Sequence, residues 1–240
     1  MVGLGRFSTR PLYVQLKDFL IQRVLAGDWK PGMAIPNEID LSREFGISVG
    51  TVRKALDEME SEGLVSRKQG RGTFVIDQTS DDYAARFSNI RDADGSRVRG
   101  TFQNCEVVAA MAHETEARKL QVPSGGPVFR LHRVCAHHGE PFMIEDSTLP
   151  QARFPGLADG GDISTTIVVL ARRYGMVLTR GEEEITVATA DRQTGKALKI
   201  AKGTPILKLD CVVYTSDDRP IEWRVGSCHL RDMHYRIALR

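Results

Sequence analysis

The chain has 240 residues, with 33 Lys and Arg against 31 Asp and Glu, and a net charge of +2 at pH 7. This length has room for two domains, and no apolar run approaches the length of a membrane-spanning helix. The N-terminus lacks the apolar stretch of a signal peptide, so we expect a cytoplasmic protein that does not enter a membrane.

The first predicted element is a helix over about residues 12–24. Its apolar side chains recur at helical spacing and form one stripe, made of Leu12, Leu16, Phe19, Leu20 and Val24. Gly27 and the turn Lys30-Pro31-Gly32 then end this helix.

Two short helices follow. Asn37 is placed to cap a helix over residues 38–45, which Gly46 ends in the left-handed conformation. Ser48 caps the next helix, which runs to about residue 62. This helix has a buried stripe of Val52, Ala55, Leu56 and Met59. Its exposed start carries Gly50, Thr51, Arg53 and Lys54. Small residues there let the backbone approach a groove floor, and the hydroxyl and cationic groups can donate to phosphates or base edges.

Two strands over residues 64–67 and 73–76 are predicted next, joined by the basic turn Lys68-Gln69-Gly70-Arg71-Gly72. A hairpin after a capped helix pair is the layout of a winged helix-turn-helix, whose wing reaches DNA phosphates. The alternative is an ordinary solvated hairpin, but three elements in the right order favour DNA binding. The predicted DNA contacts are Ser48, Gly50, Thr51, Arg53, Lys54, Lys68, Gly70, Arg71 and Thr73.

The positive charge of the chain resides in this N-terminal part. Residues 1–76 hold 11 Lys and Arg against 9 Asp and Glu, and the remainder is balanced. Counterion release by one copy is therefore modest, which favours a homodimer that reads two half-sites.

The segment PLYVQLKDFLIQRVLAGDWKPG and the residues after it resemble the N-terminal domain of the GntR family of bacterial transcription regulators. The resemblance covers residues 10–76 and is most specific in TVRKAL and QGRGTFV. It implies DNA contacts by Ser48, Thr51, Arg53, Gly70 and Arg71. Relatives often carry arginine at two positions where this chain has other residues, so the effect on base specificity is open there. These two positions are Ile39 and Val49.

Residues 77–98 are polar, charged and rich in turn formers, with Phe87 and Ile90 as the expected apolar anchors. We expect a linker here. It acts either as a hinge that changes the separation of two DNA-binding heads or as a passive tether.

From residue 99 the pattern changes to strands with short helices between them. Strands are predicted over residues 101–110, 127–137, 141–149, 176–189, 205–215 and 220–229, and helices over residues 114–120, 165–174 and 192–200. Tight turns between consecutive strands imply a mostly antiparallel sheet with packed helices, an α+β domain. The predicted domains are a winged helix-turn-helix over residues 8–76, the linker over residues 77–98, and an effector-binding and dimerisation domain over residues 99–240.

The runs PVFRLHRVCAHHGEPFMIEDSTLP and KGTPILKLDCVVYTSDDRPIEWRV resemble the UTRA effector-binding domain, a chorismate-lyase-like fold, over about residues 85–235. The whole chain thus resembles the HutC subfamily of GntR regulators. The resemblance implies a ligand between the sheet and a helix, with binding residues Arg133, Glu145, Glu222 and Thr165 or Thr166.

The residue types agree with an anionic effector. An arginine and a helix start suit a phosphate or a carboxylate, and glutamates suit hydroxyls or an amine. Cys135 stands where phosphate-binding relatives repeat an arginine, so a carboxylate is at least as fitting as a phosphosugar. A cross-strand ion pair between Arg133 and Glu145, without any ligand, is the alternative.

These features predict a metabolite-responsive repressor that binds a palindromic operator as a dimer and is released by a population shift. An activator, or an enzyme that uses the lyase-like domain, are the alternatives. No catalytic residue, cofactor or metal site is predicted. The widely spaced cysteines favour reduced thiols over a redox or metal sensor. His137 and His138 are expected to be solvated in a turn, and residues 182–184, three glutamates, to be a solvated strand edge.

Overall fold

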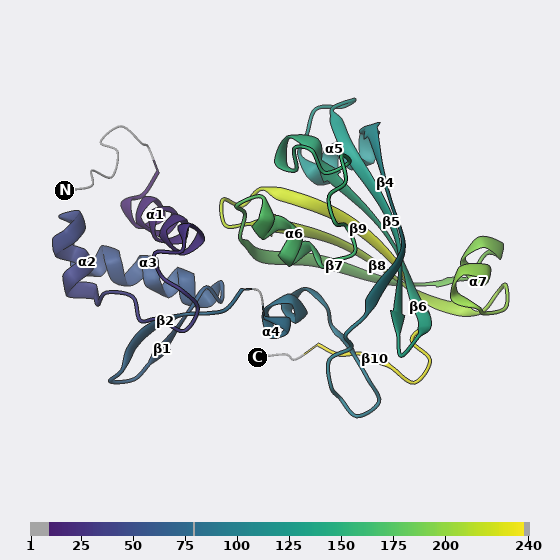
Figure 1. Cartoon of the computed structure of the whole chain (residues 1–240), viewed down its shortest axis with the longest axis horizontal. Coiled ribbons are helices and arrows are strands. Elements are labelled where there is room, and N and C mark those ends of the chain that lie inside the picture. The colour runs from purple at the N-terminus through teal and green to yellow at the C-terminus, as the bar shows by residue number, and fades with distance from the viewer. Residues whose placement is uncertain (1–9, 79, 238–240) are drawn as a thin grey trace.

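The computed structural model describes residues 10–78 and 80–237. Two parts stand side by side, a small helical unit with a hairpin and a larger sheet domain, and the linker passes between them (Figure 1). The outermost residues of the predicted domains, 8–9 and 238–240, lie outside the described residues.

The N-terminal unit has the predicted order of three helices and a hairpin. Its elements are α1 (Leu12–Ala26), α2 (Glu38–Phe45), α3 (Val49–Ser61), β1 (Val65–Lys68) and β2 (Gly72–Val75). Helix α1 packs on α3, and most of the apolar stripe of each helix is buried, with Leu16, Leu20, Val52 and Met59 fully shielded from solvent. Leu12, at the start of the predicted α1 stripe, is instead 49% exposed. The winged helix-turn-helix expected from the sequence is therefore confirmed.

The predicted caps position the helix pair. The Asn37 side chain accepts hydrogen bonds from the backbone N–H groups of Ile39 and Asp40, both at 3.0 Å. Gly46 ends α2 at φ +65°, in the left-handed region where a Cβ is strained. This short turn aims α3 away from α2, so that the start of α3 is exposed.

The linker contains more structure than its composition suggests. It forms α4 (Asp81–Ala84), a 3₁₀ turn η1 (Ala85–Phe87) and β3 (Ile90–Arg91), which pairs antiparallel with β10 (His234–Tyr235). Ile90 is buried as expected, and Phe87 is half-buried. A third anchor was not predicted: Tyr83 is buried, and its hydroxyl donates to the carbonyl oxygen of Leu178.

The larger domain is built on one fully antiparallel sheet of six strands, in the order β4-β5-β6-β9-β8-β7. The strands are β4 (Thr101–Met111), β5 (Pro127–His137), β6 (Glu140–Pro150), β7 (Leu178–Thr189), β8 (Pro205–Thr215) and β9 (Pro220–Cys228). The two predicted hairpins are present, and β6 joins them by pairing with β9. The predicted α+β class, with a mostly antiparallel sheet, is confirmed.

Three short helices complete this domain: α5 (Glu114–Leu120), α6 (Ile167–Arg173) and α7 (Arg192–Leu198), together with the 3₁₀ turn η2 (Gln151–Arg153). Helix α6 lies over one face of the sheet (Figure 1). It is shorter than the predicted 165–174 because Thr166 adopts extended backbone angles and acts as its N-cap. In the described part of the chain, no helix is long and apolar enough to cross a membrane.

Candidate DNA interface and effector cavity

The first turn of α3 presents a bare backbone. The Ser48 hydroxyl accepts from the Thr51 N–H at 3.1 Å and lies 2.8 Å from the Thr51 hydroxyl, so both hydroxyls stabilise the helix start. Gly50 is exposed, and the nearest described atom to an added Cβ would be the Ser48 hydroxyl oxygen, at 3.8 Å. This turn can therefore approach a groove closely, as predicted for a recognition helix.

The two cations of α3 are exposed and held in place. The Arg53 side chain is 60% exposed and donates through Nε and Nη2 to one Glu38 oxygen, at 3.0 and 2.8 Å. The hydrogen bond from Arg53 to Glu38 raises the pKa of this guanidinium. The Lys54 ammonium lies 3.9 Å from the ring centroid of Tyr13. Both contacts orient the cations before any DNA arrives, although Glu38 also competes with a phosphate for Arg53.

The wing has the expected shape. Gly70 and Gly72 have φ of +69° and +109°, which the tight turn requires. Arg71 is exposed at the tip, and the Lys68 ammonium lies 4.9 Å from the ring centroid of Phe74. Thr73 is half-buried in β2. The predicted wing residues thus cluster on one hairpin, next to α3.

An acidic contact that was not predicted from the sequence fixes the wing to α3. Arg67 on β1 forms an ion pair with Asp57 and lies 3.6 Å from carboxylate oxygens of Glu38 and Glu60. Asp57 and Glu60 are one turn apart on α3, the spacing that places two side chains on one helix face. These two acidic side chains therefore hold β1 of the wing against α3 through Arg67.

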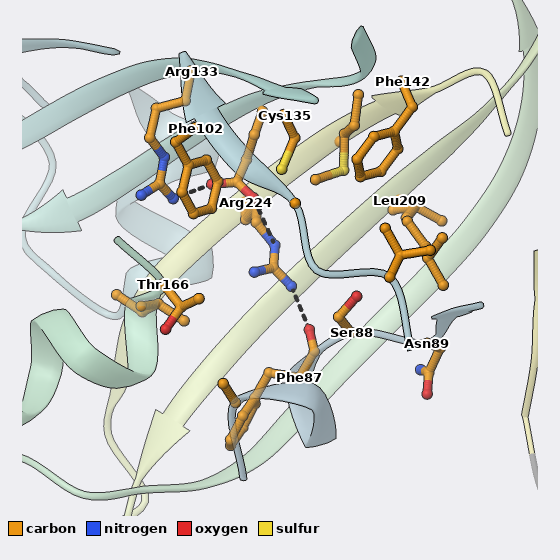
Figure 2. A pocket seen from close by; sticks show the side chains of 18 of the residues that line it. Phe87, Ser88, Asn89, Phe102, Arg133, Cys135, Phe142, Thr166, Leu209 and Arg224 are labelled. Carbon is orange, nitrogen blue, oxygen red and sulfur yellow. Dashed lines mark hydrogen bonds and ion pairs between the residues drawn. The ribbon is translucent and has the colours of Figure 1, made fainter. Parts of the chain in front are cut away.

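The sheet domain contains a cavity of about 110 Å³ between the linker, the start of α6 and one face of the sheet (Figure 2). Its wall is apolar on one side, with Phe102, Cys135, Phe142 and Leu209. Its polar side includes Ser88, Thr166 and four charged residues, Arg133, Glu145, Glu183 and Arg224. A mixed wall of this kind suits a small polar metabolite.

Arg133 is held by protein groups through most of its donors. Its side chain is 2% exposed, pairs with Glu145, and donates through Nη1 to the carbonyl oxygens of Ile163 and Thr165 at 3.0 and 2.8 Å. The guanidinium also lies 4.2 Å from the Phe102 ring centroid. Among the residues that the structure describes, no group accepts a hydrogen bond from its Nε. The cross-strand pair with Glu145 that the sequence offered as an alternative is thus present, at the wall of the cavity.

Glu222 lies behind this pair. It is 1% exposed and accepts a hydrogen bond from the Ser147 hydroxyl at 2.9 Å. Burial raises the pKa of its carboxyl group. It supports the cavity from behind, since Glu145 but not Glu222 is among the described residues that line the wall.

The cation that sequence reasoning missed is Arg224. Its Nη2 donates to the carbonyl oxygen of Phe87 at 3.0 Å, and its Nε lies 3.9 Å from Glu145 (Figure 2). Burial would lower the pKa of Arg224, but Glu222 and Glu145 raise it above its usual value, so it stays charged. Its spacing in the sequence could have pointed to it: Arg224 is two residues after the candidate Glu222, and residues two apart on a strand share a face.

Of the two threonines predicted to bind the effector, only one lines the cavity. The Thr166 hydroxyl caps α6 by accepting from the Val169 N–H at 3.4 Å, and Thr166 lines the cavity. Thr165 offers its carbonyl oxygen to Arg133 instead. The expected solvated edge at residues 182–184 is wrong at its centre, because Glu183 is half-buried, lines the cavity and accepts from the Tyr235 hydroxyl.

Two neighbouring linker residues join the cavity to the recognition helix. Phe87 accepts from Arg224, while Arg86 Nη1 donates to the carbonyl oxygen of Glu62, the C-cap of α3, at 2.6 Å. Arg86 lies tightly over Gly63, where an added Cβ would be 1.4 Å from Nη1. A shift of this short segment therefore changes its contacts both with the end of α3 and with Arg224 in the cavity wall.

All four cysteines carry free thiols. Burial raises the pKa of Cys135 to about 12 and that of Cys211 to about 11. Protonated thiols are poor nucleophiles and poor metal ligands, which fits the expected reduced, structural cysteines.

A winged helix-turn-helix joined by a contacting linker to a sheet domain with a charged cavity defines a DNA-binding transcription regulator with a sensor domain. The model of the bacterial regulatory proteins of the gntR family matches residues 12–75, and the model of the UTRA domain matches residues 95–234. The chain belongs to the GntR family and carries a UTRA domain, as its resemblance to the HutC subfamily implied.

The chain is similar over most of its length to two curated proteins and to a solved structure. The chain is 27% identical over 225 residues to the "Probable fructoselysine utilization operon transcriptional repressor" of Escherichia coli, covering 92% of this chain and 91% of that one. It is 30% identical over 200 residues to the "Histidine utilization repressor" of Pseudomonas putida, covering 82% and 79%. The crystal structure of PhnF from Mycobacterium smegmatis matches with a TM-score of 0.57 and 27% identity, over 93% and 98% of the two chains. The two curated relatives are named as repressors and the matching family is one of regulatory proteins, so the expectation of a transcription regulator is confirmed and the enzyme alternative is set aside.

Proposed function

We propose that this protein is a cytoplasmic repressor that a small metabolite releases from its operator. The observation that carries the proposal is the pair Arg86 and Phe87, which binds the end of the recognition helix on one side and a cavity arginine on the other. The division into a DNA-binding head over residues 8–76, a linker over residues 77–98 and a sensor over residues 99–240 belongs to the same proposal.

DNA contact is assigned to the start of α3 and to the wing. Ser48, Gly50 and Thr51 offer backbone and hydroxyl groups to the groove, and the cations Arg53, Lys54, Lys68 and Arg71 reach phosphates or base edges, with Gly70 and Thr73 shaping the wing. The small positive excess of the head favours a homodimer on a palindromic operator, because two half-sites multiply a modest single affinity.

The proposed effector is an anionic metabolite. Among the described residues that line the cavity, two arginines face two glutamates, so a ligand with a single carboxylate fits the balance better than a phosphate of nearly two charges. The carboxylate would pair with Arg224, and an amine or hydroxyl would contact Glu145 or Glu183, with Thr166 and the Arg133 Nε at the edge. The names of two relatives refer to fructoselysine and histidine, compounds that carry both a carboxylate and an amine. A phosphosugar is the competing outcome.

The mechanism is competition for Arg224. A ligand carboxylate is a stronger acceptor for a guanidinium than the Phe87 carbonyl oxygen. Once Phe87 is released, Arg86 no longer holds the end of α3, and the two heads of a dimer sample separations that do not match the half-sites. The ligand thereby shifts the population toward a state with low operator affinity.

A thermal-shift screen tests the effector assignment. Amino-acid-derived carboxylates and phosphosugars are compared on the wild-type chain and on the Arg224→Gln variant. We expect a carboxylate to stabilise the wild type and to lose that effect in the variant. The control is Arg153→Gln, an arginine paired with Asp217 at 3.2 Å outside the cavity. A hit that stabilises Arg224→Gln as strongly as the wild type contradicts the site.

A second assay tests repression. An operator selected from random DNA with this protein is bound in the absence and presence of the hit. Release supports the repressor, whereas tighter binding identifies an activator, and no change rejects the role of the cavity in regulation.

A further inference from the structure

A histidine pair and an aspartate from distant parts of the chain meet beside the linker. Asp92, which follows β3, lies against the turn between β5 and β6, although 45 residues separate it from His137. The Nε2 atoms of His137 and His138 are 3.1 and 3.9 Å from the same Asp92 oxygen, Oδ2. All three ligand atoms lie within 4.8 Å of one another. Two solvated histidines were expected because nothing in the sequence places Asp92 next to them.

Both ring nitrogens of His137 lie close to an oxygen atom. Its Nδ1 lies 3.3 Å from the carbonyl oxygen of Arg99, a group that can only accept a hydrogen bond. In the tautomer whose Nδ1–H donates to this carbonyl, Nε2 presents a lone pair beside the Asp92 carboxylate, and a cation can bind both groups; in the other tautomer, Nε2–H donates to Asp92. A backbone carbonyl behind the far nitrogen is the usual support of a metal-binding histidine.

Asp92 is prepared in the same way. Its Oδ1 accepts the Ala93 N–H at 2.8 Å, so Oδ2 is the oxygen left for the two imidazoles. The side chains of Asp92 and His137 are 29% and 15% exposed and thus partly fixed by packing, while that of His138 is 81% exposed. The distance that must shorten on metal binding, 3.9 Å, is therefore the one from Asp92 to the exposed His138 side chain, which has room to turn.

We propose that Asp92, His137 and His138 form a transition-metal site, with Zn²⁺ as the ion whose chemistry fits best. Two imidazole nitrogens and one carboxylate oxygen are a ligand set that Zn²⁺ takes, with water in the fourth position. Zinc bonds of about 2.0–2.2 Å place tetrahedral ligand atoms about 3.3 Å apart, close to the separation already present between Asp92 and His137.

The site would fasten the linker to the sheet domain. Residues 88–92 and 94–100 line a broad surface depression together with the two histidines, and Ser88, Asn89 and Gly100 of this stretch also line the effector cavity. An ion bound to Asp92 therefore restrains the segment that covers the cavity. Metal binding itself does not depend on the proposed effector or on operator release.

Calorimetric titration of the untagged full chain with ZnCl₂ tests the site. We expect one Zn²⁺ per chain, with at least a tenfold weaker affinity in His138→Ala and in Asp92→Asn, which keeps the shape of the side chain. The matched control is His132→Ala, since His132 also pairs with a single carboxylate, Asp146, at 2.7 Å and lacks a second imidazole. This variant should bind Zn²⁺ as the wild type does.

Substitution of Zn²⁺ by Co²⁺ identifies the ligands. Nitrogen and oxygen ligands give only the visible bands of the metal, whereas a thiolate adds a charge-transfer band in the near ultraviolet. The proposal is overturned if the wild-type chain does not bind Zn²⁺, if His138→Ala binds it as tightly as the wild type, if His132→Ala weakens binding equally, or if the cobalt spectrum shows thiolate ligation.

Discussion

The contact between Arg86 and Gly63 can be tested by comparing two glycines that have similar backbone angles but different neighbouring atoms. Gly63 and Gly46 end α3 and α2 with φ of +70° and +65°. An added Cβ at Gly46 meets no described atom within 4 Å, whereas at Gly63 it would lie 1.4 Å from Nη1 and 2.5 Å from Cζ of Arg86. Alanine at either position is strained in the left-handed region by about 1 kcal/mol, but only Gly63→Ala also expels the guanidinium.

The extra cost is the hydrogen bond from Arg86 to the Glu62 carbonyl oxygen, 2.6 Å long and at the surface. Such a bond with a charged donor contributes about 1 kcal/mol when it is solvent-exposed. We therefore expect Gly63→Ala to lower the free energy of unfolding of the head by about 2 kcal/mol, and Gly46→Ala by about 1 kcal/mol. In an Arg86→Ala background, Gly63→Ala should cost only the backbone strain.

Urea unfolding followed by tryptophan fluorescence measures these values. The chain has two tryptophans, Trp29 buried in the head and Trp223 on β9, so a Trp223→Phe background makes the signal report the head. The double-mutant cycle should give a coupling of about 1 kcal/mol between positions 63 and 86. Equal losses for the two glycine variants, together with no coupling, would refute the contact.

Three further predictions concern charge. Arg53→Ala should weaken operator binding by about 1–3 kcal/mol in an anisotropy titration, and unchanged affinity would remove Arg53 from the interface. For Glu116, burial alone would raise the pKa of the carboxyl group, but hydrogen bonds from Arg130 and the His113 backbone hold it at about 2. The ionised Glu116 therefore stabilises the fold above the pKa of the unfolded chain, and this stabilisation is lost as the pH falls toward 2. Glu116→Gln should lower the free energy of unfolding by about 2 kcal/mol at pH 7, measured by urea unfolding. A difference in unfolding free energy between wild type and variant that does not narrow between pH 4 and pH 2 would contradict this. Arg133→Ala removes the closest partner of the buried Glu145 carboxylate, which keeps only Arg224 at 3.9 Å, and should destabilise the sheet domain by about 3 kcal/mol in the same assay; a loss below 1 kcal/mol would show that the pair of Arg133 and Glu145 does not stabilise the domain.

The head could be predicted well because its cues are local. Asn37, Ser48 and Gly46 act on backbone groups within four residues, and the wing is a short hairpin with its glycines in place. Caps and turns of this kind depend little on the rest of the chain. The predicted hairpins of the sheet were found for the same reason.

What the sequence could not supply were contacts between distant segments. The pairing of β6 with β9, the anchoring of Tyr83 on Leu178 and the pairing of β3 with β10 each join residues far apart in the chain. Arg224 belongs to this class, because its role comes from facing Phe87 across the cavity. Arg133 was found by resemblance, but only the packing revealed that protein groups already hold most of its donors.

The most direct test of the regulatory account is operator affinity in Arg86→Ala, measured with and without a saturating amount of the carboxylate identified by the thermal-shift screen. Arg86 lies outside the cavity wall but holds the end of α3. We predict that the compound weakens operator binding by the wild-type chain about tenfold, a coupling of about 1.4 kcal/mol. Arg86→Ala should bind the compound equally well and respond to it much less. A variant that binds the compound and releases the operator as the wild type does would contradict the proposed route from cavity to recognition helix.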